Sequence, residues 1–198
     1  MIRSICVFCG SSAGARPEYL AAAEAVGSEL ARRGLRLVYG GGNIGTMGAL
    51  ARSALAAGGE VLGVIPRRLY ELVDHGTLED FDELFELVVA AGMHERKSRM
   101  AEASDAFIAL PGGTGTLEEF FEVWTWRHIG FHAKPVGLLE VAGFYRPLLD
   151  FLDRVAREGF LRPASLADLV VDEDPCRLID RLEKIGPPTE LKLSERKR

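Results

Sequence analysis

The chain has 198 residues, of which 47% are hydrophobic and 27% charged, and its formal net charge is −5. This length suits one domain with a substantial buried core. Proteins that bind nucleic acid usually carry a basic surface that neutralises phosphates, so the negative charge argues against a nucleic-acid partner. No apolar run approaches the ~20 residues of a membrane-spanning helix, so no membrane partner is expected. An odd count of three cysteines and the lack of a recognisable signal peptide favour a cytoplasmic location.

Short apolar runs alternate along the chain with longer runs of helical periodicity. The apolar runs predict strands at 4–10, 35–40, 60–66, 84–90, 106–111, 134–140 and 167–172. The runs of period 3.6 predict helices at 18–34, 45–59, 93–105, 117–129, 145–159 and 175–186. Residues 67–83 are acidic and irregular and predict a surface excursion. Residues 187–198 predict a polar tail of the kind that is often disordered. A single domain over 1–186 therefore precedes the tail.

This alternation predicts an α/β fold of three layers, with a mainly parallel sheet of about seven strands between two layers of helices. Strands separated by helices of 10–16 residues form right-handed βαβ units, and such strands are apolar on both faces. Ligands of these folds bind beyond the carboxyl ends of the strands. The loops at 9–12, 40–48 and 111–119 should therefore meet at one edge of the sheet.

The first glycine-rich loop, "GGGNIGTMG" (40–48), contains the pattern G-x-G-x-x-G. It follows the second predicted strand rather than the first, and no acidic residue ends the next strand, so a dinucleotide site is disfavoured. Glycines that lead into a helix N-terminus favour a phosphate site. The candidate residues of this phosphate loop are Gly41, Gly42, Gly45, Met47 and Gly48. A tight turn without a ligand is the alternative.

The second glycine-rich loop, "PGGTGTLEE" (111–119), has the same character. Gly112, Gly113 and Gly115 allow backbone N–H groups to converge on an anion. Thr116 is a plausible helix N-cap, and Glu119 follows three residues later, as in a capping box. Spacing alone leaves open whether Glu119 is a structural cap or a reactive carboxylate.

Metal and cofactor sites find little support in the sequence. Cys6 and Cys9 form a C-x-x-C inside a predicted strand, where buried, unreactive cysteines are the simpler interpretation. The four histidines lack metal-ligand spacing, so no metal is expected. None of the five lysines stands in a setting that suggests a Schiff base with pyridoxal phosphate, so no cofactor is expected.

Three stretches together resemble the LONELY GUY family of cytokinin riboside 5′-monophosphate phosphoribohydrolases, many of which were formerly labelled lysine decarboxylases. These stretches are "GGGNIGTMG", "MHERKSRM" (93–100) and "PGGTGTLEE", and the likeness runs from Ile5 to about Leu161. The resemblance implies a Rossmann-like fold and a homodimer with its site near the subunit interface. It also implies hydrolysis of N6-substituted AMP to the free base and ribose 5-phosphate.

The same resemblance implies the residues of the site. Arg96 and Glu119 match the catalytic pair of the family. The residues that match its substrate contacts are Lys97, Gly113, Thr114, Gly115, Thr116, Leu117, Glu118 and Thr125. Further candidates are Ser11 and Ser12, which follow the first strand and would hydrogen-bond adenine or phosphate, and His94, for which an exposed or capping role is the alternative.

The residue types fit cleavage of an N-glycosidic bond. Its transition state resembles an oxocarbenium ion, which a fixed carboxylate stabilises, or the carboxylate acts as a base toward water. A non-catalytic carrier of a phosphorylated cofactor, such as a molybdenum cofactor carrier, is the alternative, although a carrier would need the glycine loops and not the Arg96–Glu119 pair. Cleavage of plain AMP without cytokinin specificity also stays open.

Overall fold

The computed structural model describes residues 1–72 and 85–185, and in it seven strands form one sheet in the order β4-β3-β2-β1-β5-β6-β7. Every pairing in the sheet is parallel, which confirms the predicted architecture. The strands are β1 Ser4–Phe8, β2 Arg36–Tyr39, β3 Val61–Pro66, β4 Phe85–Ala90, β5 Ala106–Ala109, β6 Val136–Leu139 and β7 Val170–Asp172.

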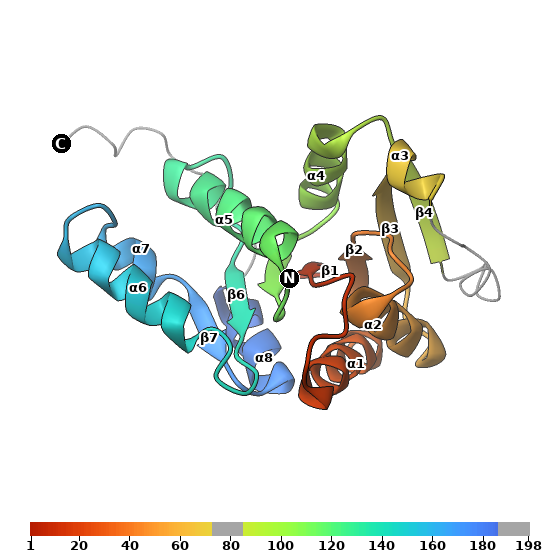
Figure 1. Cartoon of the computed structure of the whole chain (residues 1–198), viewed down its shortest axis with the longest axis horizontal. Coiled ribbons are helices and arrows are strands. Elements are labelled where there is room, and N and C mark those ends of the chain that lie inside the picture. The colour runs from red at the N-terminus through yellow and green to blue at the C-terminus, as the bar shows by residue number, and fades with distance from the viewer. Residues whose placement is uncertain (73–84, 186–198) are drawn as a thin grey trace.

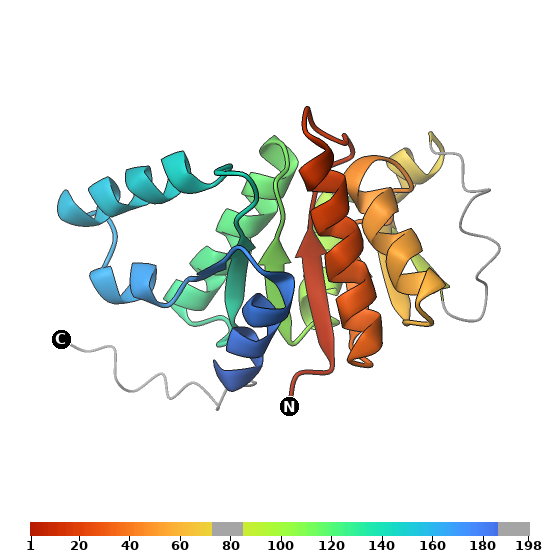
Figure 2. The same ribbon diagram turned by 90° about the horizontal axis from the view of Figure 1, so that it is seen from below.

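Helices cover both faces of this sheet (Figure 1), and none of the described helices is long and apolar enough to cross a bilayer. They are α1 Pro17–Arg32, α2 Gly45–Ala56, α3 Arg67–Tyr70, α4 Met93–Glu102, α5 Thr114–Ile129, α6 Arg146–Arg157, α7 Pro163–Ala167 and α8 Pro175–Ile185. Helices α1, α2 and α8 lie on one face (Figure 2), while α4, α5 and α6 lie on the other. Each layer packs its own apolar cluster against the strands, so the sheet is buried on both sides.

The strand order reverses at the centre of the sheet, between β1 and β5. The first four strands are laid down outward from β1, and the chain then returns from the β4 edge to add β5 on the other side of β1. Helix α4 makes this return on the face opposite α1 and α2, because a right-handed crossover in the reverse direction must use the other face. In open α/β sheets the ligand crevice lies at such a reversal.

Several boundaries differ from those predicted. Helix α5 begins at Thr114 rather than 117, because Gly113, extended at φ −87°, serves as its N-cap. Two short helices, α3 and α7, were not predicted, and α7 ends within the predicted strand 167–172, which starts only at Val170. Pro163 is pre-organised for the first turn of α7 and explains its start. Most of the predicted excursion (67–83) and the predicted tail lie outside the described residues.

Candidate active site

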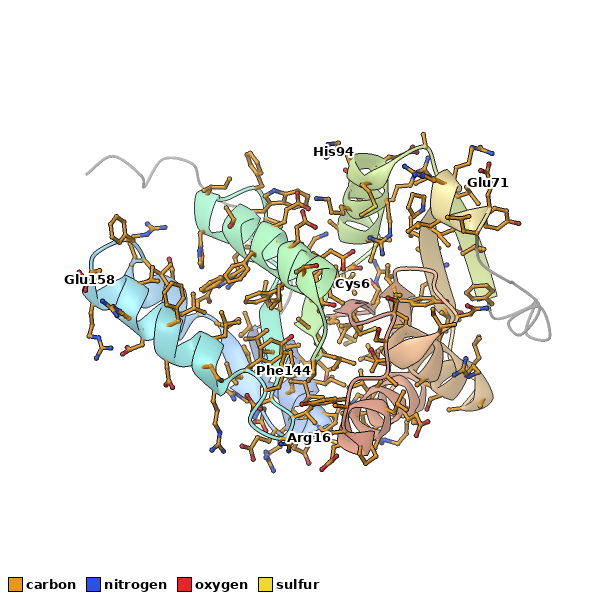
Figure 3. The ribbon with its side chains drawn as sticks, in the orientation of Figure 1. Cys6, Arg16, Glu71, His94, Phe144 and Glu158 are labelled. Atoms are coloured by element: carbon orange, nitrogen blue, oxygen red, sulfur yellow. The ribbon has the colours of Figure 1, made fainter. Side chains whose placement is uncertain are left out.

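The three loops that follow β1, β2 and β5 meet at the carboxyl edge of the sheet, as predicted. The Thr46 hydroxyl accepts a hydrogen bond from Gly10 N (2.8 Å) and donates one to Gly10 O (3.0 Å). A Cβ atom on Gly10 would lie 3.7 Å from the Cα of Gly112. A cavity of about 240 Å³ opens between the loops, and its wall includes Ser11, Ser12, Gly113, Tyr19 and Phe144. Figure 3 shows Phe144 beside the start of α1, in agreement with its ring contact to Tyr19 at 5.8 Å.

The glycines of the 40–48 loop are needed for packing within the protein. Gly41 has φ +75°, and a Cβ there would press on Ile65, while a Cβ on Gly42 would overlap the Met47 side chain. A Cβ on Gly45 would overlap the backbone of Ser11, and one on Gly48 would overlap the carbonyl of Asn43. The tight-turn interpretation therefore accounts for these glycines without a ligand, and their role in phosphate binding stays a prediction.

The start of α5 presents a different surface. Side chains added at Gly113 or Gly115 would meet no atom within 4 Å, and Thr114 between them is exposed. The first N–H groups of a helix have no partner within it, and at this helix start the surface around Gly113 and Gly115 is unobstructed. Behind this surface, Gly112 packs so closely on the buried Thr116 that a Cβ atom would overlap its side chain.

The predicted capping box at Thr116 and Glu119 is wrong. The N-cap is Gly113, no side chain caps the helix, and Thr116 lies within the first turn. The Glu119 side chain points instead across to α4, where it accepts a hydrogen bond from Nη1 of Arg96. A structural cap therefore does not explain the carboxylate.

Arg96 and Glu119 form a buried ion pair that joins α4 to α5. Each residue is only 7% exposed. The guanidinium is held from three sides, since Nε donates to the Val64 carbonyl at 2.9 Å and Nη2 lies 3.5 Å from the Gly40 carbonyl. Gly40, directly after β2, and Val64, within β3, thus fix the arginine, and the arginine fixes the carboxylate.

Burial and the charge of Arg96 have opposite effects on the pKa of Glu119. Burial raises the pKa of the Glu119 carboxyl above its ordinary value, although Arg96 opposes the rise. Burial also raises the pKa of the Cys6 thiol on the same face of the sheet, with a smaller contribution from Glu119. Cys6 and Cys9 are both unpaired and buried, and they belong to apolar clusters on opposite faces, which confirms the structural interpretation of the C-x-x-C.

Lys97 lies next to the buried pair and bridges the same two helices. Its Nζ donates to Glu118 Oε1 at 2.6 Å and to Glu122 Oε1 at 3.0 Å. Burial alone would lower the pKa of the Lys97 ammonium, but the two carboxylates outweigh it and raise the pKa. The ammonium is therefore firmly charged and already has anionic partners.

The remaining predicted residues surround this centre at different distances from it. Thr125 is exposed on α5, and Leu117 is half-buried against the cluster that includes Phe120. His94 is exposed at the outer end of α4 (Figure 3). Within residues 1–72 and 85–185, no group of three or more His, Cys, Asp and Glu side chains is arranged to hold a metal ion.

Sequence reasoning missed two elements of the site. The first is the pair of backbone carbonyls, at Gly40 and Val64, that face Arg96. The second is Glu122, which shares Lys97 with Glu118. The spacing of Glu118 and Glu122, four residues apart on one helix, is a signal that could have revealed a shared cation.

Comparison with known proteins gives consistent relatives. A family model described as "Possible lysine decarboxylase" matches residues 47–182. A probable cytokinin riboside 5′-monophosphate phosphoribohydrolase of Oryza sativa subsp. japonica is 46% identical over 98% of this chain and 78% of its own length. An enzyme of that name from Rhodococcoides fascians is 49% identical over 87% of this chain and 85% of its own.

Among solved structures, the molybdenum cofactor carrier protein of Chlamydomonas reinhardtii has a similar fold. It superposes with a TM-score of 0.68 at 22% identity, over 93% of this chain and 98% of the carrier. At that identity the likeness concerns the fold alone.

Proposed function

Because this chain belongs to the family of cytokinin riboside 5′-monophosphate phosphoribohydrolases, we propose that Arg96 and Glu119 hydrolyse the N-glycosidic bond of adenosine 5′-monophosphates, N6-substituted ones included. The products are the free adenine-type base and ribose 5-phosphate. The observation that carries this assignment is the buried Arg96–Glu119 pair beside an open helix N-terminus.

The start of α5 binds the 5′-phosphate in this proposal. Gly113, Thr114 and Gly115 leave their side of the helix open, and unpartnered N–H groups at a helix N-terminus favour an anion. Thr116 and Leu117 shape the first turn behind the phosphate. Ser11 and Ser12 line the neighbouring cavity and contribute hydroxyl groups. The first glycine-rich loop, with Gly41, Gly42, Gly45, Met47 and Gly48, supports this surface.

Glu119 then faces the anomeric carbon. It follows Thr114 by five residues, or ~7.5 Å along the helix axis, which is comparable with the span from the phosphate to the sugar of a nucleotide. As the bond to the base breaks, the sugar gains positive charge, and an ionised carboxylate stabilises it or accepts a proton from the attacking water. Lys97, Glu118 and Thr125 complete the sugar and base side of the site.

Arg96 keeps Glu119 in the required state. Burial favours the protonated carboxyl and raises the pKa of Glu119, and the fixed guanidinium opposes that rise by favouring the ionised form. Since Nε and Nη1 bind Val64 and Glu119, the arginine also aims the carboxylate.

Two other functions are less well supported. A cofactor carrier would have no use for a buried, paired carboxylate next to its anion site. A decarboxylase using pyridoxal phosphate needs a readily deprotonated lysine beside its phosphate site, whereas the carboxylates around Lys97 raise its pKa. Burial lowers the pKa of Lys134, but this residue precedes β6 and so lies at the amino edge of the sheet, opposite the glycine-rich loops.

The proposal extends to a homodimer in the cytoplasm. Ile129 and Phe131, at the end of α5, are 45% and 76% exposed, which is typical of a surface that a second subunit covers. Cys176 is an exposed free thiol, in keeping with a reducing compartment. Light scattering of the purified protein measures the assembly directly.

A direct assay tests the reaction. Purified protein is incubated with AMP and N6-isopentenyl-AMP, and free base is followed by chromatography. Glu119→Gln keeps the size of the side chain and should lower kcat by at least ~100-fold, since it removes charge from the transition state. Arg96→Ala should lose comparable activity, with a thermal melt to establish folding. Wild-type turnover in Glu119→Gln would end the proposal.

A further inference from the structure

Lys97 is bonded to two carboxylates of α5 that differ in burial. Glu118 and Glu122 are four residues apart, so they lie on the same side of the helix, one turn from each other. The side chain of Glu118 is 52% exposed, whereas that of Glu122 is 24% exposed and that of Lys97 only 12%. One carboxylate therefore faces the solvent side of the ammonium and the other lies behind it.

The inner carboxylate has an unusual environment for a surface ion pair. Its Oε2 is buried and has no hydrogen-bond partner among the residues that the structure describes, while Oε1 accepts from Lys97. A buried acceptor without a partner is destabilising, because nothing compensates the water that it has lost. Stability alone thus gives little reason for a carboxylate at position 122, and its visible contribution is the bond to Lys97.

The charges of the cluster limit what Lys97 can do. One ammonium between two carboxylates leaves a net negative group, which repels a phosphate at close range. A carboxylate is an acceptor only, and its two oxygens suit the hydroxyl donors of a sugar diol. Glu118 is exposed and precedes Glu119 directly in α5, so it lies at the level of the helix that the proposed function gives to the sugar.

We propose that Glu122 is a positioning residue that holds Lys97, and that Lys97 in turn orients Glu118 to accept hydrogen bonds from the ribose 2′- and 3′-hydroxyl groups. This inference rests on the proposed function and adds to it the means by which the site recognises ribose. The Lys97 ammonium holds the two carboxylates in place and does not bind the phosphate of the nucleotide. The phosphate binds at the start of α5.

Sugar discrimination tests this role. Steady-state rates are measured for AMP and 2′-deoxy-AMP with the wild type, Glu118→Gln, Glu122→Gln and a control, Glu158→Gln, which removes an exposed charge on the distant end of α6. We expect Glu118→Gln and Glu122→Gln to raise KM for AMP about tenfold with a smaller change in kcat. The rise in KM for 2′-deoxy-AMP should be clearly smaller, because that nucleotide keeps only one of the two hydroxyl groups. The control should behave as the wild type for both nucleotides.

A second measurement does not depend on turnover. Lys97 is one of five lysines, so its acetylation by an amine-reactive reagent can be followed by mass spectrometry of the intact fold. Glu122→Gln should accelerate labelling of Lys97 several-fold, by freeing the amine, while Lys184 on α8 serves as an internal reference. Equal labelling of Lys97 in the wild type and Glu122→Gln overturns the inference, as does an unchanged preference for AMP. Failure of the wild type to cleave either nucleotide instead overturns the proposed function, and the labelling still decides whether Glu122 holds Lys97.

Discussion

Gly40 offers a sharp test, because a single methyl group added there acts directly on Arg96. A Cβ at this position would fall well inside contact distance of Arg96 Nη2, at 3.4 Å from its Cζ and 3.2 Å from Met47 Sδ. The backbone of Gly40 is not in the left-handed region, so alanine adds bulk without straining the chain. The substitution Gly40→Ala therefore tests mainly the displacement of the guanidinium, with a smaller adjustment of the Met47 side chain.

The size of the effect follows from the contacts of the arginine. Normal packing requires about 3.5 Å between heavy atoms, so the guanidinium must move by roughly 1 Å or more. It cannot swing away freely, because Nε is bonded to Val64 at 2.9 Å and Nη1 to Glu119. Overpacking costs about 1–3 kcal/mol, and complete loss of a buried ion pair costs about 3–5 kcal/mol. We expect a loss of about 2 kcal/mol in the free energy of unfolding.

Activity should suffer more than stability. A displacement of about 1 Å in catalytic geometry costs on the order of 100-fold in rate. The matched control is Gly27→Ala, whose Cβ would overlap the Leu50 carbonyl where α1 packs on α2, away from the site. Chemical denaturation and kcat for AMP are measured for both variants. Comparable destabilisation with a loss of kcat only in Gly40→Ala is the expected result, and wild-type kcat in Gly40→Ala would refute the claim that these two backbone segments aim Arg96.

Three further predictions concern pH and charge. The raised pKa of Glu119 should place the acid limb of the kcat/KM profile above the ordinary carboxyl value of 4.5, and a limb at or below 4.5 would contradict an essential buried carboxylate. Burial lowers the pKa of His132 to about 4, so the folded state excludes the proton that the unfolded chain binds near pH 6.5. Stability present above pH 6.5 should therefore decline down to about pH 4, and melts of His132→Gln should show a flatter decline. Hydrogen bonds from Arg32 and Arg33 lower the pKa of Glu29 to about 2, although burial opposes them. Arg33 also binds Asp180 and Glu183 of α8, so this network joins α1 to α8. Its contribution to stability should be fully present above pH 4.5 and lost toward pH 2. Glu29→Gln should remove that part of the acid dependence, as measured by denaturation at each pH.

The layers and the parallel sheet were predictable because short apolar runs alternate regularly with longer runs of helical period along this chain. Seven strands appear where seven runs were found, and the convergence of three loops at one edge follows from parallel strands alone. The strand order did not follow from the pattern, because periodicity says nothing of which strands are neighbours. The short helix α7 was missed because five residues are too few to show a period.

The sequence predicted which residues form the site but not which contacts they make. Thr116 and Glu119 fit a capping box by spacing, and only tertiary structure shows that α4 offers Glu119 a stronger partner than the helix end does. The holding of Arg96 by Gly40 and Val64 was not predictable either, since backbone carbonyls carry no sequence signature. Gly40 is visible in the sequence, but it was interpreted only as part of the glycine-rich loop.

The return of the chain across the sheet between β4 and β5 has a consequence for how the enzyme matures. Arg96 arrives with the portion of the sheet that ends at β4, and Glu119 arrives with the portion that begins at β5, so neither portion holds both charges. A partly folded chain in which the two portions are not docked therefore lacks the ion pair. The buried pair, and with it the proposed hydrolysis, therefore forms only when β5 pairs with β1 and the two portions dock.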